Sequence, residues 1–328
     1  MEQETKEAIK DFLERKAAHV RVLVLGDVML DRYFYGDVTR ISPEAPVPVN
    51  RIEKKKDTLG GAANVAHNLA QLGCQTYLVG VIGDDHHGHV LQRKLKKRNI
   101  HTEGIFFGRE KTTTKIRILG GHQQMIRLDF EETDTIDEAT REKLEQYVVD
   151  RISLGVDAII LSDYGKGICT PRLCQDVIKK ASGQGVYVFV DPKGSDWEKY
   201  AGAAYITPNV KEASLVIGKS LANEDRALRE AAAQIKANFG IHRVMITRSE
   251  KGISLFGQNQ EVTVPTLAQE VFDVSGAGDT VISVFSAAIG SGMDENAAVQ
   301  MANYAAGIEV GKLGTYAVSR EEIIQKLL

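Results

Sequence analysis

Residues 273–280 read Asp273-Val274-Ser275-Gly276-Ala277-Gly278-Asp279-Thr280, and the small-residue run 281–289 follows directly. The triplet Gly276-Ala277-Gly278 lets backbone N–H groups turn toward one point at the start of a helix, where they and the helix dipole form an anion site. Asp279 would then lie in the first helical turn, where a carboxylate can take a proton from a hydroxyl that faces a phosphate. An N-capped helix with an acidic first turn would show the same residues, so the remaining chain decides between the two interpretations.

Composition and charge narrow the class of protein. The chain has 328 residues, of which 43% are hydrophobic and 26% charged, as is typical of a globular protein with a sizeable core. The formal net charge is −3, which favours neither nucleic acid nor a membrane surface, so an anionic ligand would depend on locally placed Lys and Arg. The three cysteines, Cys74, Cys169 and Cys174, cannot all pair and match no zinc motif, which favours a reducing compartment.

The N-terminal segment 1–16 alternates Glu, Lys and apolar residues, which predicts a charged amphipathic helix. No apolar core follows its basic residues, as a secretory signal peptide would require, and the sequence contains no apolar run long enough to span a bilayer. We therefore expect a cytoplasmic protein.

Short apolar strands alternate with helical segments over most of the chain. Strands are predicted at 20–26, 77–82, 156–161, 186–190, 203–207 and 243–247. Helices are predicted at 60–72, 89–97, 137–151, 170–182, 209–217 and 224–238. This alternation predicts one α/β domain, 1–328, with a mostly parallel sheet that helices cover on both faces.

Two segments interrupt the alternation. Segment 33–53 begins with three aromatic residues and continues with Pro43, Pro46 and Pro48, and segment 112–130 places basic residues between apolar ones. We interpret both as extended, partly exposed strands that form a small β-lid over the ligand edge of the sheet. Exposed strands need cover, and pairing with a second copy of the chain is one way to obtain it.

Polar and small residues follow the first predicted strand. Asp27 and Asp31 come directly after it, where carboxylates can accept hydrogen bonds from sugar hydroxyls; a loop aspartate that caps a helix is an equal alternative. The segment Gly60-Gly61-Ala62-Ala63-Asn64 opens a helix. Its small residues permit close approach of a ligand, and the amide of Asn64 can donate to and accept from a polyol.

Three later strands are also followed by charged loops, namely Asp163-Tyr164-Gly165-Lys166-Gly167, Asp191-Pro192-Lys193 and Pro208-Asn209-Val210-Lys211-Glu212. Each loop alone is explained by solvation. Together they predict one pocket at the sheet edge, with cations for phosphates and carboxylates for a hydroxyl or a hydrated metal. The stretch 247–252, from Thr247 to Gly252, is predicted as a turn between two strands, which is either a plain hairpin or a contact for a nucleotide phosphate.

The chain resembles the ribokinase-like, or PfkB-type, carbohydrate kinases from about Val20 to its end. Gly60-Gly61-Ala62-Ala63-Asn64-Val65-Ala66 resembles the first motif of that family. Asp273–Thr280 resembles the second, usually Asp-Thr-x-Gly-Ala-Gly-Asp, with Val274 in place of the usual Thr. The resemblance implies a three-layer αβα sandwich with a β-strand lid.

Within that family the chain is most similar to the D-glycero-β-D-manno-heptose 7-phosphate kinases of lipopolysaccharide-core biosynthesis. The similarity is carried by Arg40–Val49, by Lys115-Ile116-Arg117, by Gln123–Asp129 and by the Asp163–Gly167 loop. Many relatives carry a C-terminal adenylyltransferase domain. This chain leaves no room for one, so we expect either a stand-alone kinase or the kinase portion of a longer protein.

The resemblance also implies roles for individual residues. Asp279 would remove the proton from the anomeric hydroxyl, and the backbone N–H groups of Gly276, Ala277 and Gly278 would stabilise charge on the γ-phosphoryl group. The nucleotide and its Mg²⁺ would be held by Asn209, Glu212, Lys193, Thr247 and Gly252, with Glu212 acting on the metal through water. The sugar would meet Asp27, Gly61, Asn64 and Asp163. A monovalent cation such as K⁺ would use Asp273.

A phosphate on the far end of the sugar would need cations away from the reacting hydroxyl. We predict Lys115, Arg117, Arg127 and Lys166 for this role, and Arg suits bidentate binding of phosphate best. The partners expected from the resemblance are a phosphosugar, ATP and a second copy of the chain bound through the lid. The alternatives are a kinase for ribose, fructose or a fructose phosphate, and a non-catalytic sugar-phosphate or nucleotide sensor on the same fold.

Overall fold

A central sheet of nine strands, in the order β13-β12-β11-β10-β9-β8-β1-β4-β5, runs through the part of the chain that the structure describes. The structure is a computed structural model that describes residues 2–121, 123–257, 260–268 and 270–327. The strands are β1 Arg21–Gly26, β4 Gln75–Gly83, β5 His101–Arg109, β8 Ala158–Ser162, β9 Tyr187–Asp191, β10 Tyr205–Ile206, β11 Arg243–Thr247, β12 Ile253–Phe256 and β13 Glu261–Val264.

The strands from β5 to β11 pair in parallel, and β12 and β13 join antiparallel at one edge. The prediction of a mostly parallel sheet is therefore confirmed. The sequence reasoning missed the two edge strands of the sheet, β5 on one side and β13 on the other, although the turn at 247–252 implied a strand after it. Edge strands are exposed on one side and lack the continuous apolar pattern of buried strands.

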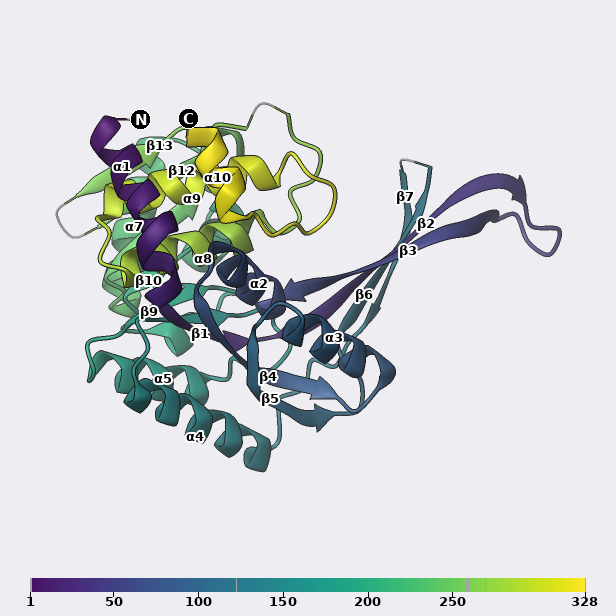
Figure 1. The fold of residues 1–328 in the computed structure, drawn as a ribbon, viewed down its shortest axis with the longest axis horizontal. Helices are drawn as coiled ribbons and strands as arrows, with labels where there is room; N and C mark the ends of the chain where they lie inside the picture. The colour runs from purple at the N-terminus through teal and green to yellow at the C-terminus, as the bar shows by residue number, and fades with distance from the viewer. Residues whose placement is uncertain (1, 122, 258–259, 269, 328) are drawn as a thin grey trace.

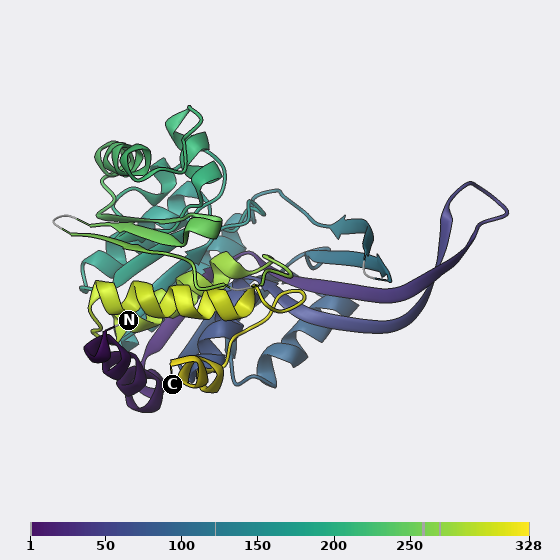
Figure 2. The same cartoon turned by 90° about the horizontal axis from the view of Figure 1, so that it is seen from above.

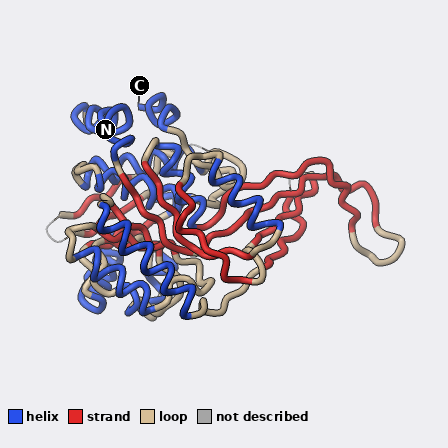
Figure 3. The backbone as a smooth tube through the Cα atoms, turned by 60° about the horizontal axis from the view of Figure 1, so that its bottom comes forward, coloured by secondary structure: helices blue, strands red, loops and turns tan. Residues whose placement is uncertain are grey.

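Helices cover both faces of the sheet (Figures 1 and 3). They are α1 Gln3–Asp11, α2 Ala62–Leu72, α3 His86–Lys96, α4 Glu138–Leu154, α5 Pro171–Ser182, α6 Val210–Ile217, α7 Asp225–Phe239, α8 Ala277–Gly290, α9 Glu295–Glu309 and α10 Arg320–Leu327. The two helix layers pack against opposite faces of the sheet. The strand β1 shows this, because alternate side chains of a strand point to opposite faces. Val22 and Val24 pack with α1, α2, α8 and α9, whereas Leu23 and Leu25 pack with α4, α5 and α7.

Four further strands form the predicted lid, in the order β3-β2-β6-β7. Their bounds are β2 Val28–Ile41, β3 Pro48–Gly61, β6 Thr114–Gly120 and β7 Gln123–Phe130. The long β2–β3 hairpin leaves the body as a twisted ribbon, which Figure 2 shows reaching well beyond the helices. The strand β2 starts earlier than the predicted lid segment. Residues 28–31 form its buried beginning, and only the later part of β2 is exposed.

One helix start was predicted two residues too early. Gly60 and Gly61 end β3, and α2 begins only at Ala62. Gly61 has φ +54°, and a Cβ there would come within 2.5 Å of the Asp27 carbonyl oxygen, so glycine is required where β3 meets the end of β1. The expected ligand edge of the sheet is thus packed tightly against the base of the lid.

Candidate active site

The start of α8 forms the predicted turn with free N–H groups. Gly276 takes φ +106°, which glycine tolerates and other residues rarely adopt, and its carbonyl accepts the first helical hydrogen bond from Thr280 at 2.9 Å. Within the described ranges, no side chain caps this helix, and of its first N–H groups that of Ala277 donates to the Val274 carbonyl at 3.3 Å, so the others are the ones available for an anion. The following turns of α8 are buried among α2, α9 and the sheet, which fixes the direction of the helix axis.

Asp279 lies at this helix start and is only 3% exposed. Asn64 donates to its Oδ2 at 2.8 Å from Nδ2, and the Tyr164 hydroxyl donates to Oδ1 at 2.5 Å. Burial raises the pKa of Asp279 to about 6, and the two donors offset part of that rise by stabilising the ionised form. The carboxylate is therefore held in one orientation with a pKa suited to a general base near neutral pH.

Tyr164 gives the first testable prediction. A base acts only when ionised, so kcat/KM is expected to rise with pH through about 6 and level off above it. Replacing Tyr164 with Phe removes a donor to the ionised Asp279, so the acidic limb should move up by about one pH unit. Rate measurements from pH 5 to pH 8 check this shift, with the exposed Tyr187→Phe variant as the control. An unmoved limb would show that Tyr164 does not tune the base.

Asp27 lies at the predicted edge of the sheet, but protein groups surround its carboxylate. Its carboxylate is 2% exposed and accepts backbone hydrogen bonds from Tyr164 at 2.8 Å, Lys166 at 3.0 Å and Ile168 at 3.3 Å. These three donors engage both oxygens, so Asp27 organises the loop after β8 and has little capacity left for a sugar hydroxyl. The sequence shows a carboxylate after a strand but does not show which groups will surround it.

Asp163 is similarly engaged by protein groups. Lys199 and the Tyr200 hydroxyl each lie 2.5 Å from its Oδ2, and the Gly165 N–H donates to Oδ1 at 2.7 Å. The side chain is buried. These bonds disfavour the prediction that Asp163 contacts the sugar and indicate that it holds the loop in place. Asp31, which follows on β2, is a buried carboxylate that also lies near Asp279.

The loops after β8, β9, β10 and β11 meet the start of α8 at one small cavity of about 140 Å³. Its lining consists of Asp163, Tyr164, Asp191, Pro192, Lys193, Thr207, Asn209, Glu212, Thr247 and Gly278. These residues come from segments far apart in the sequence, as predicted for neighbouring parallel strands that end at the same edge. The four positions that the sequence reasoning joined in one cleft, 27, 64, 209 and 279, therefore do gather at the same edge of the sheet.

Asn209 and Glu212 form a reciprocal capping box at the start of α6. The Asn209 side chain accepts from the Glu212 N–H at 2.9 Å, and the Glu212 carboxylate accepts from the Asn209 N–H at 3.0 Å. The other Glu212 oxygen lies 3.6 Å from Lys193 Nζ. The pair thus has a structural role that the sequence reasoning did not consider, and one carboxylate oxygen still faces the cavity lysine.

Asp191 carries more of the cavity's charge than the sequence reasoning assigned to it. Burial raises the pKa of Asp191 well above its ordinary value, and the neighbouring Asp279 and Glu212 carboxylates raise it further. Three carboxylates, Asp163, Asp191 and Glu212, line the cavity with a single lysine, Lys193. Lys199 already neutralises Asp163, and the raised pKa of Asp191 indicates that protein cations do not fully balance its charged form, which a hydrated divalent cation would do.

Gly278 gives the second prediction. Of the atoms that the structure describes, none lies within 4 Å of a Cβ added at Gly278, and the residue lines the cavity. Replacing Gly278 with Ala should keep or slightly raise stability, by about 0.5–1 kcal/mol, since Ala favours the helix. The methyl group should occupy space meant for a phosphate and raise KM for ATP on the order of tenfold. Steady-state kinetics and thermal melting check this, with Gly183→Ala, at the residue that follows α5, as the control. A normal KM for ATP would place the nucleotide elsewhere.

The turn at 247–252 is the predicted hairpin connection between β11 and β12. Thr247 lines the cavity, and its N–H donates to Pro208 at 3.0 Å. Gly252 has φ +82°, and a Cβ there would lie 2.0 Å from the Val264 carbonyl oxygen. The glycine is therefore required by close backbone packing, and its predicted contact with ATP is untested.

The four predicted phosphate-binding cations gather on one region of the lid and the neighbouring loop. Cross-strand pairing places Lys115 opposite Asp31 and Asp129, and Arg117 opposite Arg127, on the same face of the lid. Three of the four cations form ion pairs: Arg117 with Asp31 at 2.6 Å, Arg127 with Asp129 at 2.9 Å, and Lys166 with Glu131 at 2.8 Å.

Lys115 differs from the other three. Within the described chain it has no ion-pair partner, and burial with the nearby cations Lys166 and Arg127 lowers its pKa. Arg117, by contrast, is neutralised by Asp31 and lies over the Tyr33 ring at 5.3 Å. The structure therefore favours Lys115 over Arg117 as a group free to meet an anion.

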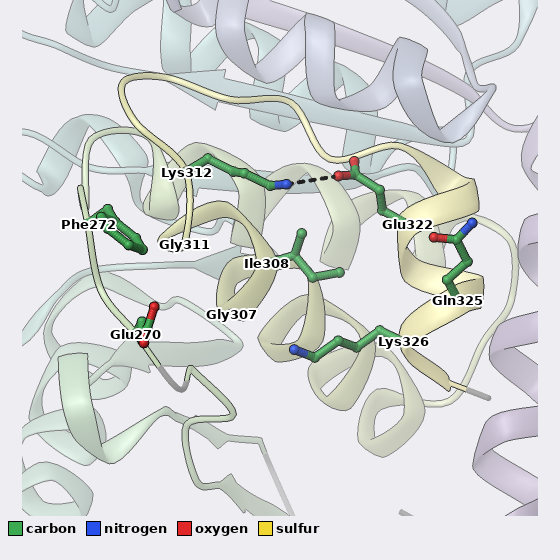
Figure 4. A pocket seen from close by; sticks show the side chains of 9 residues that line it. All are labelled: Glu270, Phe272, Gly307, Ile308, Gly311, Lys312, Glu322, Gln325 and Lys326. Atoms are coloured by element: carbon green, nitrogen blue, oxygen red, sulfur yellow. Dashed lines mark ion pairs between the residues drawn. The ribbon is translucent and has the colours of Figure 1, made fainter.

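A larger cavity, of about 560 Å³, lies away from this site (Figure 4). It is bounded by the end of α9, by α10 and by Glu270 and Phe272, and an ion pair between Lys312 and Glu322 at 3.5 Å crosses one side. None of the predicted site residues lines it. Cavity size alone therefore does not locate the chemistry, whereas converging polar groups around Asp279 do.

Comparison with known proteins defines the class. The pfkB family of carbohydrate kinases matches residues 20–322, and the chain belongs to this family. The fold is that of a ribokinase complexed with ribose and ATP from Arabidopsis thaliana, with a TM-score of 0.73, 20% identity, and coverage of 94% of this chain and 98% of that one. Phosphofructokinase-2 from Escherichia coli in complex with potassium gives a TM-score of 0.77 at 18% identity, covering 94% and 97%. The protein is a carbohydrate kinase.

Relatives with higher sequence identity share one name, HldE. The chain is 43% identical over 321 residues to the bifunctional protein HldE of Citrifermentans bemidjiense, covering 97% of this chain and 65% of the relative. It is 47% identical over 308 residues to the bifunctional protein HldE of Actinobacillus succinogenes, covering 93% and 63%. The chain thus spans less than two thirds of the length of these relatives. Across the ranges given above, no helix is both long and apolar enough to cross a membrane.

Proposed function

We propose that this kinase transfers the γ-phosphoryl group of ATP to O1 of D-glycero-β-D-manno-heptose 7-phosphate, giving the 1,7-bisphosphate, a step toward ADP-heptose and the lipopolysaccharide core. The observation that carries the proposal is the position of Asp279. It lies in the first turn of α8, which no side chain caps, and it is held by Asn64 and Tyr164. The similarity to proteins named HldE supports a heptose substrate.

The chain's own groups account for most of the work in such a transfer, because phosphoryl transfer depends mainly on positioning and charge stabilisation. The Asp279 carboxylate takes the proton from the attacking hydroxyl. The N–H groups at Gly276, Ala277 and Gly278 meet the oxygens of the transferred phosphoryl group. Asn64 keeps the base oriented, and Asp31 is better placed than Asp27 to accept from a sugar hydroxyl, because its Oδ1 binds only Arg117.

Two metal ions belong to the proposal. Glu212 and Asp191 would hold Mg²⁺ and its waters at the cavity, and their surplus negative charge supports this assignment. Bound Mg²⁺ would neutralise charge on the nucleotide phosphates. Asp273 would provide a side chain for a monovalent cation beside the loop, in keeping with the potassium complex of the related fold.

The 7-phosphate is assigned chiefly to Lys115, with Lys166 and Arg127 beside it. Replacing Lys115 with Met keeps the apolar stem and removes the charge. We expect KM for the phosphosugar to rise about tenfold or more, as for loss of a charge-assisted hydrogen bond, while KM for ATP stays normal. Steady-state kinetics with varied sugar check this, and the exposed Lys111→Met variant is the matched control. An unchanged KM for the phosphosugar would place the phosphate elsewhere.

A homodimer through the lid is part of the same proposal. The lid exposes several large apolar side chains, namely Val38, Ile41, Val47, Ile52, Met125, Ile126, Leu128 and Phe130. A second copy of the chain would cover them and the open strand edges. Light scattering in solution tests this, and a monomer at micromolar concentration would contradict it. We also place the protein in the cytoplasm, where ATP and sugar phosphates are available.

The central experiment is product analysis by mass spectrometry after incubation with MgATP and a mixture of C5 to C7 sugars and their phosphates. A heptose bisphosphate as the main product is the expected result. Phosphorylated ribose, fructose or fructose phosphate as the main product would replace the heptose assignment with one of those substrates. If no sugar increases ATP consumption, the protein is a sensor. The intact Asp279 beside an intact Gly-Ala-Gly turn counts against that outcome.

A further inference from the structure

Arg109, the last residue of the edge strand β5, is a buried cation that the proposed mechanism does not use. Its side chain is only 5% exposed, and its ion-pair partner in the described chain, Glu132, lies 3.8 Å away. The guanidinium donates instead to three backbone carbonyl oxygens, those of Glu132 at 3.3 Å, Asp134 at 3.2 Å and Lys166. A planar fork of donors that is used on carbonyls holds segments of the chain in place, and here it joins two segments that are distant in sequence.

The first of these segments, 131–134, is where the chain returns from the lid. It follows β7 and leads to α4. Arg109 itself lies where the chain leaves β5 for the lid strand β6. Glu132 strengthens the same junction, because its Oε1 accepts from the Lys111 N–H at 3.0 Å. One guanidinium therefore lies at both the beginning and the end of the β6–β7 half of the lid.

The second segment is the loop after β8. Lys166 is held on both sides of its backbone, because its N–H donates to Asp27 at 3.0 Å and its carbonyl accepts from Arg109. Two residues earlier in this loop, the Tyr164 N–H donates to Asp27 at 2.8 Å, and the Tyr164 hydroxyl donates to Asp279 at 2.5 Å. Arg109 thus fixes the loop that orients the proposed base.

The two segments are packed directly against each other. Gly167 has φ +86°, and a Cβ there would lie 2.2 Å from the Asp134 carbonyl oxygen. Beside this contact, Lys166 Nζ pairs with Glu131 at 2.8 Å. Closely packed backbone transmits displacement, because it leaves no space to absorb it. A movement of 131–134 must therefore either move the loop after β8 or break the hydrogen bonds of Arg109.

We propose that Arg109 is a positioning residue that couples the β6–β7 half of the lid to the loop that carries Tyr164. The lid and the base then reach their working positions together. This inference rests on the proposed roles of Asp279 as the base and of Lys115, on β6, as a phosphate ligand. A sugar phosphate bound to Lys115 fixes β6 and β7, and Arg109 extends that order to Tyr164.

The effect of Arg109 on the base should pass through Tyr164 alone. The other titratable groups near Asp279 are Asp31, Asp191 and Glu309. Within the described residues, Arg109 forms hydrogen bonds or ion pairs with none of these three carboxyl groups. A change at Arg109 that alters the ionisation of Asp279 should therefore do so by changing how well the Tyr164 hydroxyl is held.

The test replaces Arg109 with Lys, which keeps the charge but has a single ammonium group in place of a fork, so it cannot hold both segments. We expect KM for the phosphosugar to rise about fivefold and KM for ATP to stay normal. The acidic limb of kcat/KM should move up by about half a pH unit, because a less ordered Tyr164 stabilises ionised Asp279 less. Arg243→Lys is the control, since Arg243 pairs with Glu295 at the end of β11 opposite the cavity, and it should change neither quantity.

The double variant Arg109→Lys/Tyr164→Phe separates this coupling from general damage to the structure. If Arg109 acts through the Tyr164 hydroxyl, the double variant should have the same acidic limb as Tyr164→Phe alone. A limb that moves further by the full Arg109→Lys shift would overturn the proposal. So would an Arg109→Lys variant in which both the limb and KM for the phosphosugar match the wild type.

If Arg109→Lys does not fold, or if Tyr164→Phe alone leaves the limb unmoved, hydrogen–deuterium exchange of the wild type decides. An unmoved limb in Tyr164→Phe is a failure of the proposed base chemistry, whereas exchange does not involve turnover. The probe is the sugar that product analysis identifies, added with a non-hydrolysable ATP analogue. Slower exchange in both β6–β7 and residues 164–168 supports the coupling. Slower exchange in only one of these segments, or in neither, contradicts it.

Discussion

Replacing Asp279 with Asn is expected to cut turnover by about 10²–10⁴-fold while ATP binding stays close to normal, because the amide cannot accept the hydroxyl proton. The substitution is nearly isosteric, and the Tyr164 hydroxyl can still donate to the amide oxygen, so the fold should survive. Steady-state kinetics give the loss in kcat, and calorimetric titration with nucleotide gives the binding. Unfolding should occur at a temperature close to that of the wild type.

The matched control is Asp294→Asn, a helix cap at the start of α9 that accepts from the Ala297 N–H at 3.0 Å. Asn is also a good N-cap, so this variant should keep full activity. Near-normal turnover in Asp279→Asn would remove that residue from the role of base. The remaining acidic groups near the reacting hydroxyl, Asp31 and Asp191, would then be the candidates to test.

Replacing Asp27 with Ala should mainly destabilise the protein. The change leaves three buried backbone N–H groups, those of Tyr164, Lys166 and Ile168, without their acceptor. Buried donors that lose a charged acceptor are costly, so we expect the free energy of unfolding to fall by about 3 kcal/mol or more. Urea denaturation measures this, and Asp37→Ala, an exposed aspartate farther along β2, should change stability by less than about 0.5 kcal/mol.

The two interpretations of Asp27 separate cleanly in this experiment. If Asp27 served only as a sugar ligand, Asp27→Ala would unfold at the wild-type urea concentration and show a raised KM for sugar. Loss of stability together with loss of activity is the result that the loop contacts predict. A stable variant with weak sugar binding would restore the role that the sequence alone suggested.

The sequence predicted the αβα architecture, the parallel centre of the sheet and the lid well, because buried strands and glycine turns leave strong local signals. The sequence also predicted that the loops after β8, β9 and β10 lie at one edge of the sheet, because neighbouring parallel strands end at the same edge. It failed at the two edge strands of the sheet, β5 and β13, whose buried and exposed residues are mixed. The helix after the Gly60-Gly61 pair was placed early because glycines that end a strand look like glycines that start a helix.

Individual roles were harder to predict than positions. Asp27 and Asp163 were chosen as sugar ligands because carboxylates follow strands, yet both are engaged by protein donors that the sequence does not reveal. Tyr164 was visible in its motif, but the direction of its hydroxyl depends on tertiary packing. Arg109 gave no signal at all, since an arginine at the end of an edge strand is normally exposed. The tertiary fold decides which side chains contact one another, and local sequence patterns do not contain this information.

The ribbon of β2 and β3 has a mechanical consequence. Asp31 near its root and the exposed tip near Ile41 belong to one continuous strand, so the ribbon links its tip to the place where we propose that the sugar binds. Pairing with β3 shifts register between Tyr35 and Gly36 and again between Val38 and Arg40. Such irregularities are where a strand bends most easily. We therefore expect movement of the exposed tip to bend the ribbon at these irregularities and to leave the buried part near Asp31 unchanged.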